Sequence, residues 1–160
     1  MQITELIAAL GERIGLKLGL DETGSCTLAV DGMSVVIQEV SEADLVGFWG
    51  RIGSPPPEGL ERLYGLMLEA NHLFRATAGA TISRDPETKD FFLCRVLDLR
   101  VLEAESFILA LERFVNTLEN WQRLVIDYRP VAASGETKDG EGDDAAGQGG
   151  LGMEPGFIRI

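Results

Sequence analysis

The sequence of 160 residues is poor in the residue types that most metal and redox centres use. It contains one histidine, His72, and two cysteines, Cys26 and Cys94, in apolar segments far apart in the chain. Zinc sites need three or four ligands at spacings such as CxxC or HxxxH, and neither spacing occurs. We therefore expect no metal ion and no cofactor, and reduced, buried thiols rather than a disulfide.

Long hydrophobic runs and basic residues are also scarce. No apolar run approaches the roughly 18 residues that a membrane-spanning helix needs, and the start, "MQITELIAALGERIG", lacks the basic region and cleavage site of a secretory leader. The 26 acidic residues outnumber the 14 basic ones, and the resulting net charge of −12 repels phosphate backbones. We expect a cytoplasmic protein that neither inserts into a membrane nor binds nucleic acid.

The sequence does contain alternating helical and strand periods. Apolar residues at helical spacing predict helices over residues 3–14, 60–74 and 103–125, and Gly15 suits a left-handed cap for the first. Strands are predicted over residues 26–30 and 33–40, joined by the hairpin turn Asp31-Gly32, and over residues 45–52, 80–84 and 91–99. This order predicts an α+β domain over residues 1–129: helix, three-strand meander, helix, two strands and a long helix, with a twisted antiparallel sheet.

The predicted strand over residues 91–99 is apolar on both of its sides. One side carries Phe92, Cys94 and Val96, and the other carries Phe91, Leu93, Leu97 and Leu99, interrupted by Arg95. An antiparallel sheet with one solvated face normally has a polar side there. Either helices cover both faces of the sheet, or a partner chain covers the second one.

The segment "RATAGATISRD", residues 75–85, invites a phosphate-binding or catalytic interpretation. A P-loop needs GxxxxGK[ST], and a dinucleotide fold needs its glycines after a strand and before a helix, whereas here the order is reversed. Ser83 and His72 could form a pair, but nothing resembles a nucleophile elbow. The acidic residues are scattered along turns and helix faces. We interpret the segment as a junction between a helix and a strand, and keep a small hydrolase as the weaker alternative.

Residues 70–121, which begin with "ANHLFRATAGATISRD", resemble the signature region of class I type III secretion chaperones, the Tir-chaperone (CesT-like) family. In that family a helix ends in an asparagine-containing segment, and a Gly- and Ala-rich strand start, a turn, an apolar strand and a final helix ending near a tryptophan follow. The matching positions are Asn71, Phe74, Ala78, Gly79, Ala80, Phe92, Leu97, Phe107, Phe114 and Trp121. The resemblance covers about residues 1–128. The prolines at positions 55–57 and the glycine-rich tail depart from the usual member.

The resemblance implies a small acidic homodimer of the bacterial cytoplasm without catalytic activity. Such a chaperone binds the amino-terminal region of a secreted effector and keeps that region extended and competent for export. An open antiparallel sheet suits this role, because its unpaired edge can accept an added strand. The alternative is a protein-binding or regulatory module of related fold that takes no part in secretion.

Two sets of residues are predicted to carry these interactions. The predicted effector-binding surface lies on the first helix and the adjoining meander and comprises Leu6, Leu10, Ile14, Leu16, Leu28, Val30, Val35, Ile37 and Trp49. Most of these could equally be internal core. The resemblance places the homodimer interface on the second helix, at Leu60, Leu63, Tyr64, Met67 and Leu68.

Composition changes abruptly at Pro130. The stretch "PVAASGETKDGEGDDAAGQGG" has almost no large apolar residues and is typical of a linker. Apolar residues then return in "LGMEPGFIRI". We expect residues 130–160 to form an acidic, glycine-rich tail whose apolar end, residues 157–160, docks in extended form on an apolar groove or sheet edge. The alternative is a linker that contacts nothing.

Overall fold

The computed structural model describes residues 2–40 and 44–129. The elements follow in the order α1 (Ile3–Ile14), β1 (Ser25–Val30), β2 (Met33–Val40), β3 (Leu45–Gly53), α2 (Leu60–Asn71), a 3-10 turn (His72–Phe74), β4 (Thr81–Arg84), β5 (Phe91–Asp98) and α3 (Ala104–Asp127). The predicted α+β class and order of elements are confirmed. The predicted tail, residues 130–160, lies outside the described residues.

The five strands form one antiparallel sheet in the order β1-β2-β3-β5-β4. The hairpin between β1 and β2 turns at Asp31 and Gly32, whose φ angles of 48° and 82° are those of a tight two-residue turn. Pairing of β5 with β3 leaves the short strand β4 at an outer edge. The three-strand meander β1-β2-β3 was predicted from the sequence. The pairing of β5, rather than β4, with β3 was not predicted.

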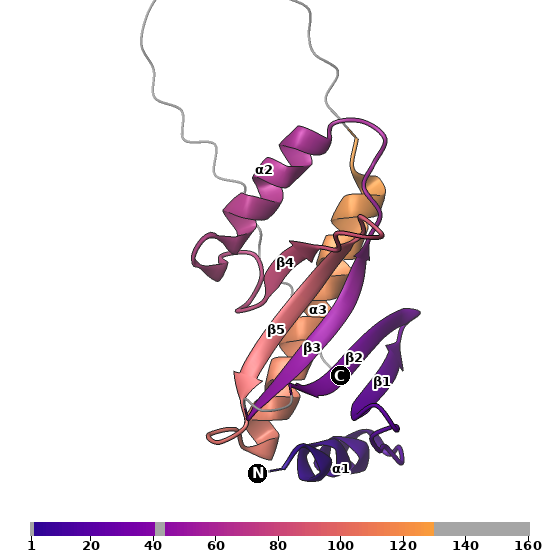
Figure 1. Cartoon of the computed structure of the whole chain (residues 1–160), viewed down its shortest axis with the longest axis vertical. Helices are drawn as coiled ribbons and strands as arrows, with labels where there is room; N and C mark the ends of the chain where they lie inside the picture. Colours follow the sequence, from indigo (N-terminus) through magenta and orange to yellow (C-terminus); the bar gives the residue numbers. More distant parts are fainter. Residues whose placement is uncertain (1, 41–43, 130–160) are drawn as a thin grey trace, which may run out of the picture.

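All three helices pack on one face of the sheet. Phe48 of β3 makes edge-to-face contacts with Phe107 and Phe114 of α3, at centroid distances of 5.5 and 5.7 Å. Tyr64 of α2 contacts Phe91 on the same face, 5.9 Å away. The inner residues of α1 complete this single core. Figure 1 shows α3 running along the sheet, with α1 and α2 at opposite ends. Within residues 2–40 and 44–129, helices therefore cover only one face of the sheet.

Gly50 allows α3 to approach β3 closely. A Cβ at this position would lie 2.3 Å from Cδ2 of Leu118, which is fully buried. We expect Gly50→Ala to lower the free energy of unfolding by about 1–3 kcal/mol, because the core has no room for the methyl group. Urea unfolding measures this. Gly65→Ala is the matched control: nothing lies within 4 Å of its Cβ, and alanine favours a helix by up to about 1 kcal/mol. Unchanged or higher stability of Gly50→Ala would contradict the prediction.

Helix α2 ends at Asn71, so the prediction that this helix extends to Phe74 is wrong. Leu73 and Phe74 have left-handed φ angles of 54° and 55°, and Phe74 is 54% exposed. The Asn71 side chain turns toward β4, where its Nδ2 donates to the carbonyl of Ile82 (3.1 Å) and its Oδ1 accepts from the Ile82 N–H (2.8 Å). Apolar periodicity could not reveal the Asn71–Ile82 contact, because it joins the helix to a separate strand.

We expect Asn71→Ala to lower the free energy of unfolding by about 1–3 kcal/mol, since both backbone groups of Ile82 would lose their partner. Urea unfolding is again the measurement. The neighbouring His72→Ala is the control, because His72 is exposed and a surface substitution usually changes stability by less than about 0.5 kcal/mol. Equal effects of the two substitutions would show that the Asn71–Ile82 bonds contribute nothing.

Candidate functional site

The outer strand β1 presents backbone groups that have no partner among the described residues. The Ser25 carbonyl accepts a hydrogen bond from the Asp21 N–H (2.8 Å) on the side away from β2. Backbone groups along an antiparallel strand point alternately toward and away from its neighbour, so those of Thr27 and Ala29 also point outward. Both residues are exposed, and residues 2–40 and 44–129 provide no hydrogen bond to these outward groups. An unpaired row of this kind can accept another strand; we call it the β1 edge.

In the other outer strand, β4, the outward backbone groups of the central residue are hydrogen-bonded to a side chain. The two bonds from Asn71 satisfy the N–H and C=O of Ile82 as a neighbouring strand would. Just before the strand, the Ala80 N–H donates to the Thr77 carbonyl (2.9 Å). Of the two outer strands, β1 therefore has two successive outward-facing residues, Thr27 and Ala29, whose backbone groups lack a described partner, whereas the middle of β4 is bonded through Asn71.

Apolar side chains lie exposed at the same end of the molecule as β1. Gly15, with a φ of 71°, ends α1, and the Leu16 N–H closes the turn on the Gly11 carbonyl (2.9 Å). Ile14 and Leu16 are left 46% and 59% exposed. Figure 1 shows α1 next to β1. Exposed aliphatic residues beside an unpaired edge offer side-chain contacts as well as backbone bonds.

The structure divides the nine predicted effector-binding residues into three groups. Those in the core, exposed by 7% or less, are Leu6, Leu10, Leu28, Val35 and Ile37. Ile14 and Leu16 are exposed, and Val30 is half-buried at the end of β1. Trp49 is half-buried on the opposite face of the sheet. Of the nine residues, Ile14 and Leu16 are therefore accessible before the start of β1, and Val30 is partly accessible at its other end, next to the hairpin turn. A docked partner cannot reach the five core residues in this conformation.

The sheet face opposite the helices has an apolar centre, which we call the open face. Val36 of β2, Trp49 of β3 and Cys94 of β5 lie in register across it, and all three are half-buried. Val96, two residues further along β5, is 52% exposed. The apolar outer side of the predicted strand over residues 91–99 was the sequence signal for this face. Val36 carried no such signal.

The indole ring of Trp49 packs directly over Gly47. A Cβ at Gly47 would be 2.3 Å from Cη2 of the Trp49 indole. The ring consequently lies flat over β3 and closes part of the open face. Glycine is required here because any side chain would displace the indole from the sheet.

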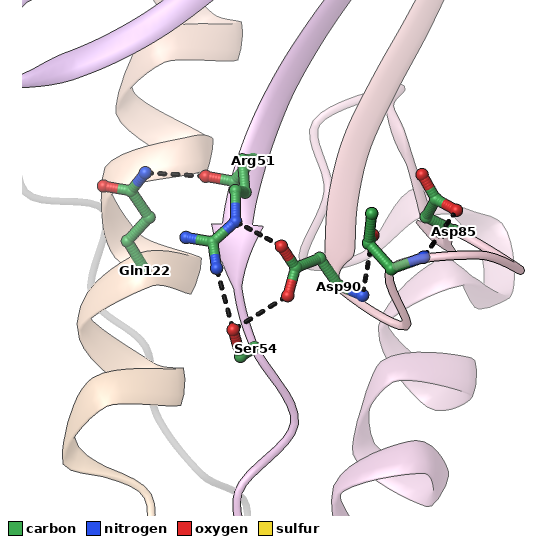
Figure 2. A network of polar contacts seen from close by, with 6 residues as sticks. Arg51, Ser54, Asp85, Asp90 and Gln122 are labelled. Atoms are coloured by element: carbon green, nitrogen blue, oxygen red, sulfur yellow. Dashed lines mark hydrogen bonds and ion pairs between the residues drawn. The ribbon is translucent and has the colours of Figure 1, made fainter.

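A polar network fixes one end of the open face, where β3 leads toward α2 (Figure 2). Arg51 donates from Nε to Asp90 Oδ2 (2.6 Å) and from a terminal nitrogen to Ser54 Oγ (2.8 Å), and Ser54 Oγ donates to Asp90 Oδ1 (2.8 Å). The hydrogen bond from Arg51 is the main cause that lowers the pKa of Asp90. Gln122 Nε2 donates to the Arg51 carbonyl (2.7 Å) and joins α3 to this end.

Helix α2 has an outer stripe besides its core-facing one. Of the five predicted dimer residues, Leu63 and Met67 lie in the core, with 0% and 4% exposure. Leu60, Tyr64 and Leu68 recur every four residues, as side chains on one helix face do; Leu60 and Tyr64 are half-buried, and Leu68 is 70% exposed. Leu73 and Phe74, 71% and 54% exposed, extend the apolar surface beyond the helix. We call Leu68, Leu73 and Phe74 the α2 surface.

The residues weighed for catalysis do not form a site in the described chain. Ser83 Oγ lies 3.4 Å from Cys94 Sγ, and His72 is exposed at the end of α2. Desolvation raises the pKa of the Cys94 thiol, which favours its unreactive protonated form. In residues 2–40 and 44–129, no three His, Cys, Asp or Glu side chains are grouped as a metal site requires, and no helix is long and apolar enough to cross a membrane.

Comparison with solved structures places the fold among secretion chaperones. The chain is similar to a chain of the crystal structure of the ExsC–ExsE complex, with a TM-score of 0.65 and 26% identity over 78% of this chain and 97% of that one. It is similar in fold to the Yersinia pestis type III secretion chaperone SycH, solved with a fragment of YscM2 (TM-score 0.60, 16% identity, 75% and 99% coverage). The heterodimeric ExoU–SpcU complex of the Pseudomonas aeruginosa type III secretion system gives a TM-score of 0.60 at 20% identity, with 81% and 100% coverage.

The comparison of sequences agrees with the fold. A search among curated proteins found no significant match. The model of the Tir chaperone protein (CesT) family, however, matches residues 5–122, which is most of the described chain and extends from α1 into the last turns of α3. The resemblance seen in residues 70–121 is therefore confirmed. The chain belongs to the Tir chaperone protein (CesT) family.

Proposed function

We propose that this protein binds the amino-terminal region of a secreted effector at the β1 edge and keeps that region extended for export by a type III secretion system. The observation that carries the proposal is the unpaired edge at Thr27 and Ala29 beside exposed Ile14 and Leu16. Membership of the Tir chaperone family supports it. So do the solved neighbours, one of which is described as the HopA1–SchA chaperone–effector complex.

The chemistry of the β1 edge suits an extended segment of low sequence specificity. Two outward N–H and two outward C=O groups bond to any backbone, whatever its side chains. Specificity then comes from apolar side chains that contact Ile14, Leu16 and Val30. A folded protein has already paired its own strands, so the edge selects chain that is not yet folded.

The proposal includes a homodimer formed through the α2 surface. Leu68, Leu73 and Phe74 are exposed by half or more of their area. Clustered exposed aliphatic and aromatic residues of this kind mark protein interfaces. A two-fold interface would bring each of these residues near its own copy or a close neighbour.

The proposed action is binding without catalysis. Cys94, not an imidazole, is the polar partner of Ser83 in the described structure. A hydrolase screen with His72→Ala as the reference tests the alternative: activity that is lost in this variant would contradict the proposal.

The direct test is co-purification from the native bacterium, followed by mass spectrometry and deletion mapping of the captured protein. We expect a secreted protein whose first hundred or so residues are required for capture. Leu16→Glu should weaken capture while the cooperative thermal transition stays unchanged, because Leu16 is 59% exposed. Capture of a protein that the secretion system does not export would favour the regulatory module instead.

A further inference from the structure

We infer that residues 157–160, Phe-Ile-Arg-Ile, pair as a strand with the β1 edge of their own chain and occupy the place that we propose for the effector. Residues 130–160 lie outside the described structure, which ends at Arg129.

The β1 edge is the suitable acceptor in the described sheet. Ile82 at the centre of β4 is already bonded through Asn71. Thr27 and Ala29 in β1 have outward groups without a described partner. A segment that adds by backbone pairing therefore finds its donors and acceptors at β1.

The segment has the composition of a short strand. Isoleucine and phenylalanine favour β-structure, and three of the four residues are of these types. Pro155 and Gly156 come directly before it and favour a turn that separates it from the preceding chain. The residues between Arg129 and this turn are rich in glycine and polar side chains, as a linker requires.

The segment can reach β1 from the point where the described chain ends. The Tyr128 hydroxyl donates to the Gly59 carbonyl (2.9 Å), and the Cβ position of Gly53 is 3.3 Å from Val125, so α3 ends beside the end of β3. Leu28 pairs with Val35, which pairs with Gly50. The last residues of β1 therefore lie level with the end of β3, two strand spacings or about 10 Å to the side. A glycine-rich linker of the length of residues 130–156 spans about 30 Å on average.

Charge also favours this position. Arg159 is the one charged side chain in residues 155–160, and acidic residues flank β1: Asp21 and Glu22 before it and Asp31 after it. Hydrogen bonds from Thr23 and Ser25 hold the pKa of Asp21 below its usual value. The Arg159 side chain therefore carries the charge opposite to that of the carboxylates at the two ends of the edge.

Occupation of the edge would make residues 157–160 an internal competitor of the effector. The unpaired edge would be protected from aggregation while the chaperone is empty. An effector would have to displace the segment. Its apparent affinity would therefore equal its intrinsic affinity multiplied by the fraction of molecules whose edge is open. Only this competitive role rests on the proposed function; docking of the segment does not.

The test measures amide hydrogen exchange by NMR in the full chain without any effector. Ile158→Pro with Arg159→Pro removes an N–H in either register of the added strand. We expect exchange at Thr27 and Ala29 to become at least tenfold faster in this variant. The matched control, Ala145→Pro with Ala146→Pro, places two prolines in the linker and should leave exchange unchanged. Equally fast exchange in the native chain and in both variants would overturn the inference.

Two further measurements separate the remaining outcomes. Tenfold dilution of the native chain should not alter exchange at Thr27 and Ala29; loss of protection on dilution would assign the segment to a second copy and overturn pairing within one chain. The captured effector fragment should bind the Ile158→Pro, Arg159→Pro variant several-fold more tightly than the native chain. Protection at β1 with unchanged affinity would overturn the competition. If no effector is captured at all, the exchange result still decides whether the segment docks.

Discussion

Replacing Leu68 by glutamate should convert the proposed homodimer into a monomer of about 17.4 kDa without loss of the fold. Leu68 is 70% exposed in the single chain, so its replacement disturbs no internal packing. In a dimer formed through the α2 surface the new carboxylate would be buried against its own copy, and burying unpaired charge is costly. Size-exclusion chromatography with light scattering at micromolar concentration measures the mass.

The same substitution at other positions provides the controls for this prediction. Leu109→Glu changes an exposed leucine of α3 (47% exposed) and should leave the dimer intact. Leu63→Glu cannot serve, because Leu63 is fully buried and a charge there would unfold the chain itself. A native chain that is already monomeric, or a Leu68→Glu variant that remains dimeric, would exclude the α2 surface as the interface.

Thr27→Pro should abolish strand addition at the β1 edge and lower effector affinity at least tenfold. The Thr27 N–H points away from β2, so proline removes an outward donor and leaves the bonds between β1 and β2 in place. Its ring also obstructs the approach of a neighbouring strand. Isothermal titration with the captured amino-terminal fragment measures affinity, and thermal unfolding measures the fold.

Thr27→Val is the matched control, because it keeps the N–H and the β-branched shape and should bind as the native chain does. Leu28→Pro serves as the opposite control. The Leu28 N–H faces β2, so its loss should destabilise the sheet itself. Native affinity in Thr27→Pro, with the thermal transition intact, would show that effectors bind elsewhere, for example on the open face.

Several features of the fold were predictable because local residues cause them. The end of α1 follows from Gly15, which adopts the left-handed conformation at low cost, and the β1–β2 turn follows from Asp31 and Gly32. The end of α2 was not predictable in this way. Asn71, the last residue of the helix, bonds to Ile82 eleven residues later in the chain, and apolar periodicity does not encode that contact.

The candidate site was predicted in outline but not residue by residue. Apolar periodicity identified Leu6, Leu28 and Ile37 along with Ile14 and Leu16, since it reports that a side chain avoids water and not what it contacts. The structure places the first three in the core and the last two at the surface. Thr27 and Ala29 were not among the predicted residues, because the role that we propose for them depends on backbone groups, which every residue has.

By itself, the sequence determined the class of fold, the order of its elements and, through the pattern in residues 70–121, the chaperone family. The fold class, the order of elements and the family pattern depend on local periodicity, turn residues and spacing, which are properties of short stretches of sequence. Only the tertiary structure decided that the three helices of residues 2–40 and 44–129 lie on one face, that β5 pairs with β3, and that Asn71 bonds the middle of β4 while Thr27 and Ala29 of β1 have no partner among these residues. Each of these depends on which distant segments meet. That choice is made by packing and by the pairing of backbone groups, and neither is visible in any single stretch of residues.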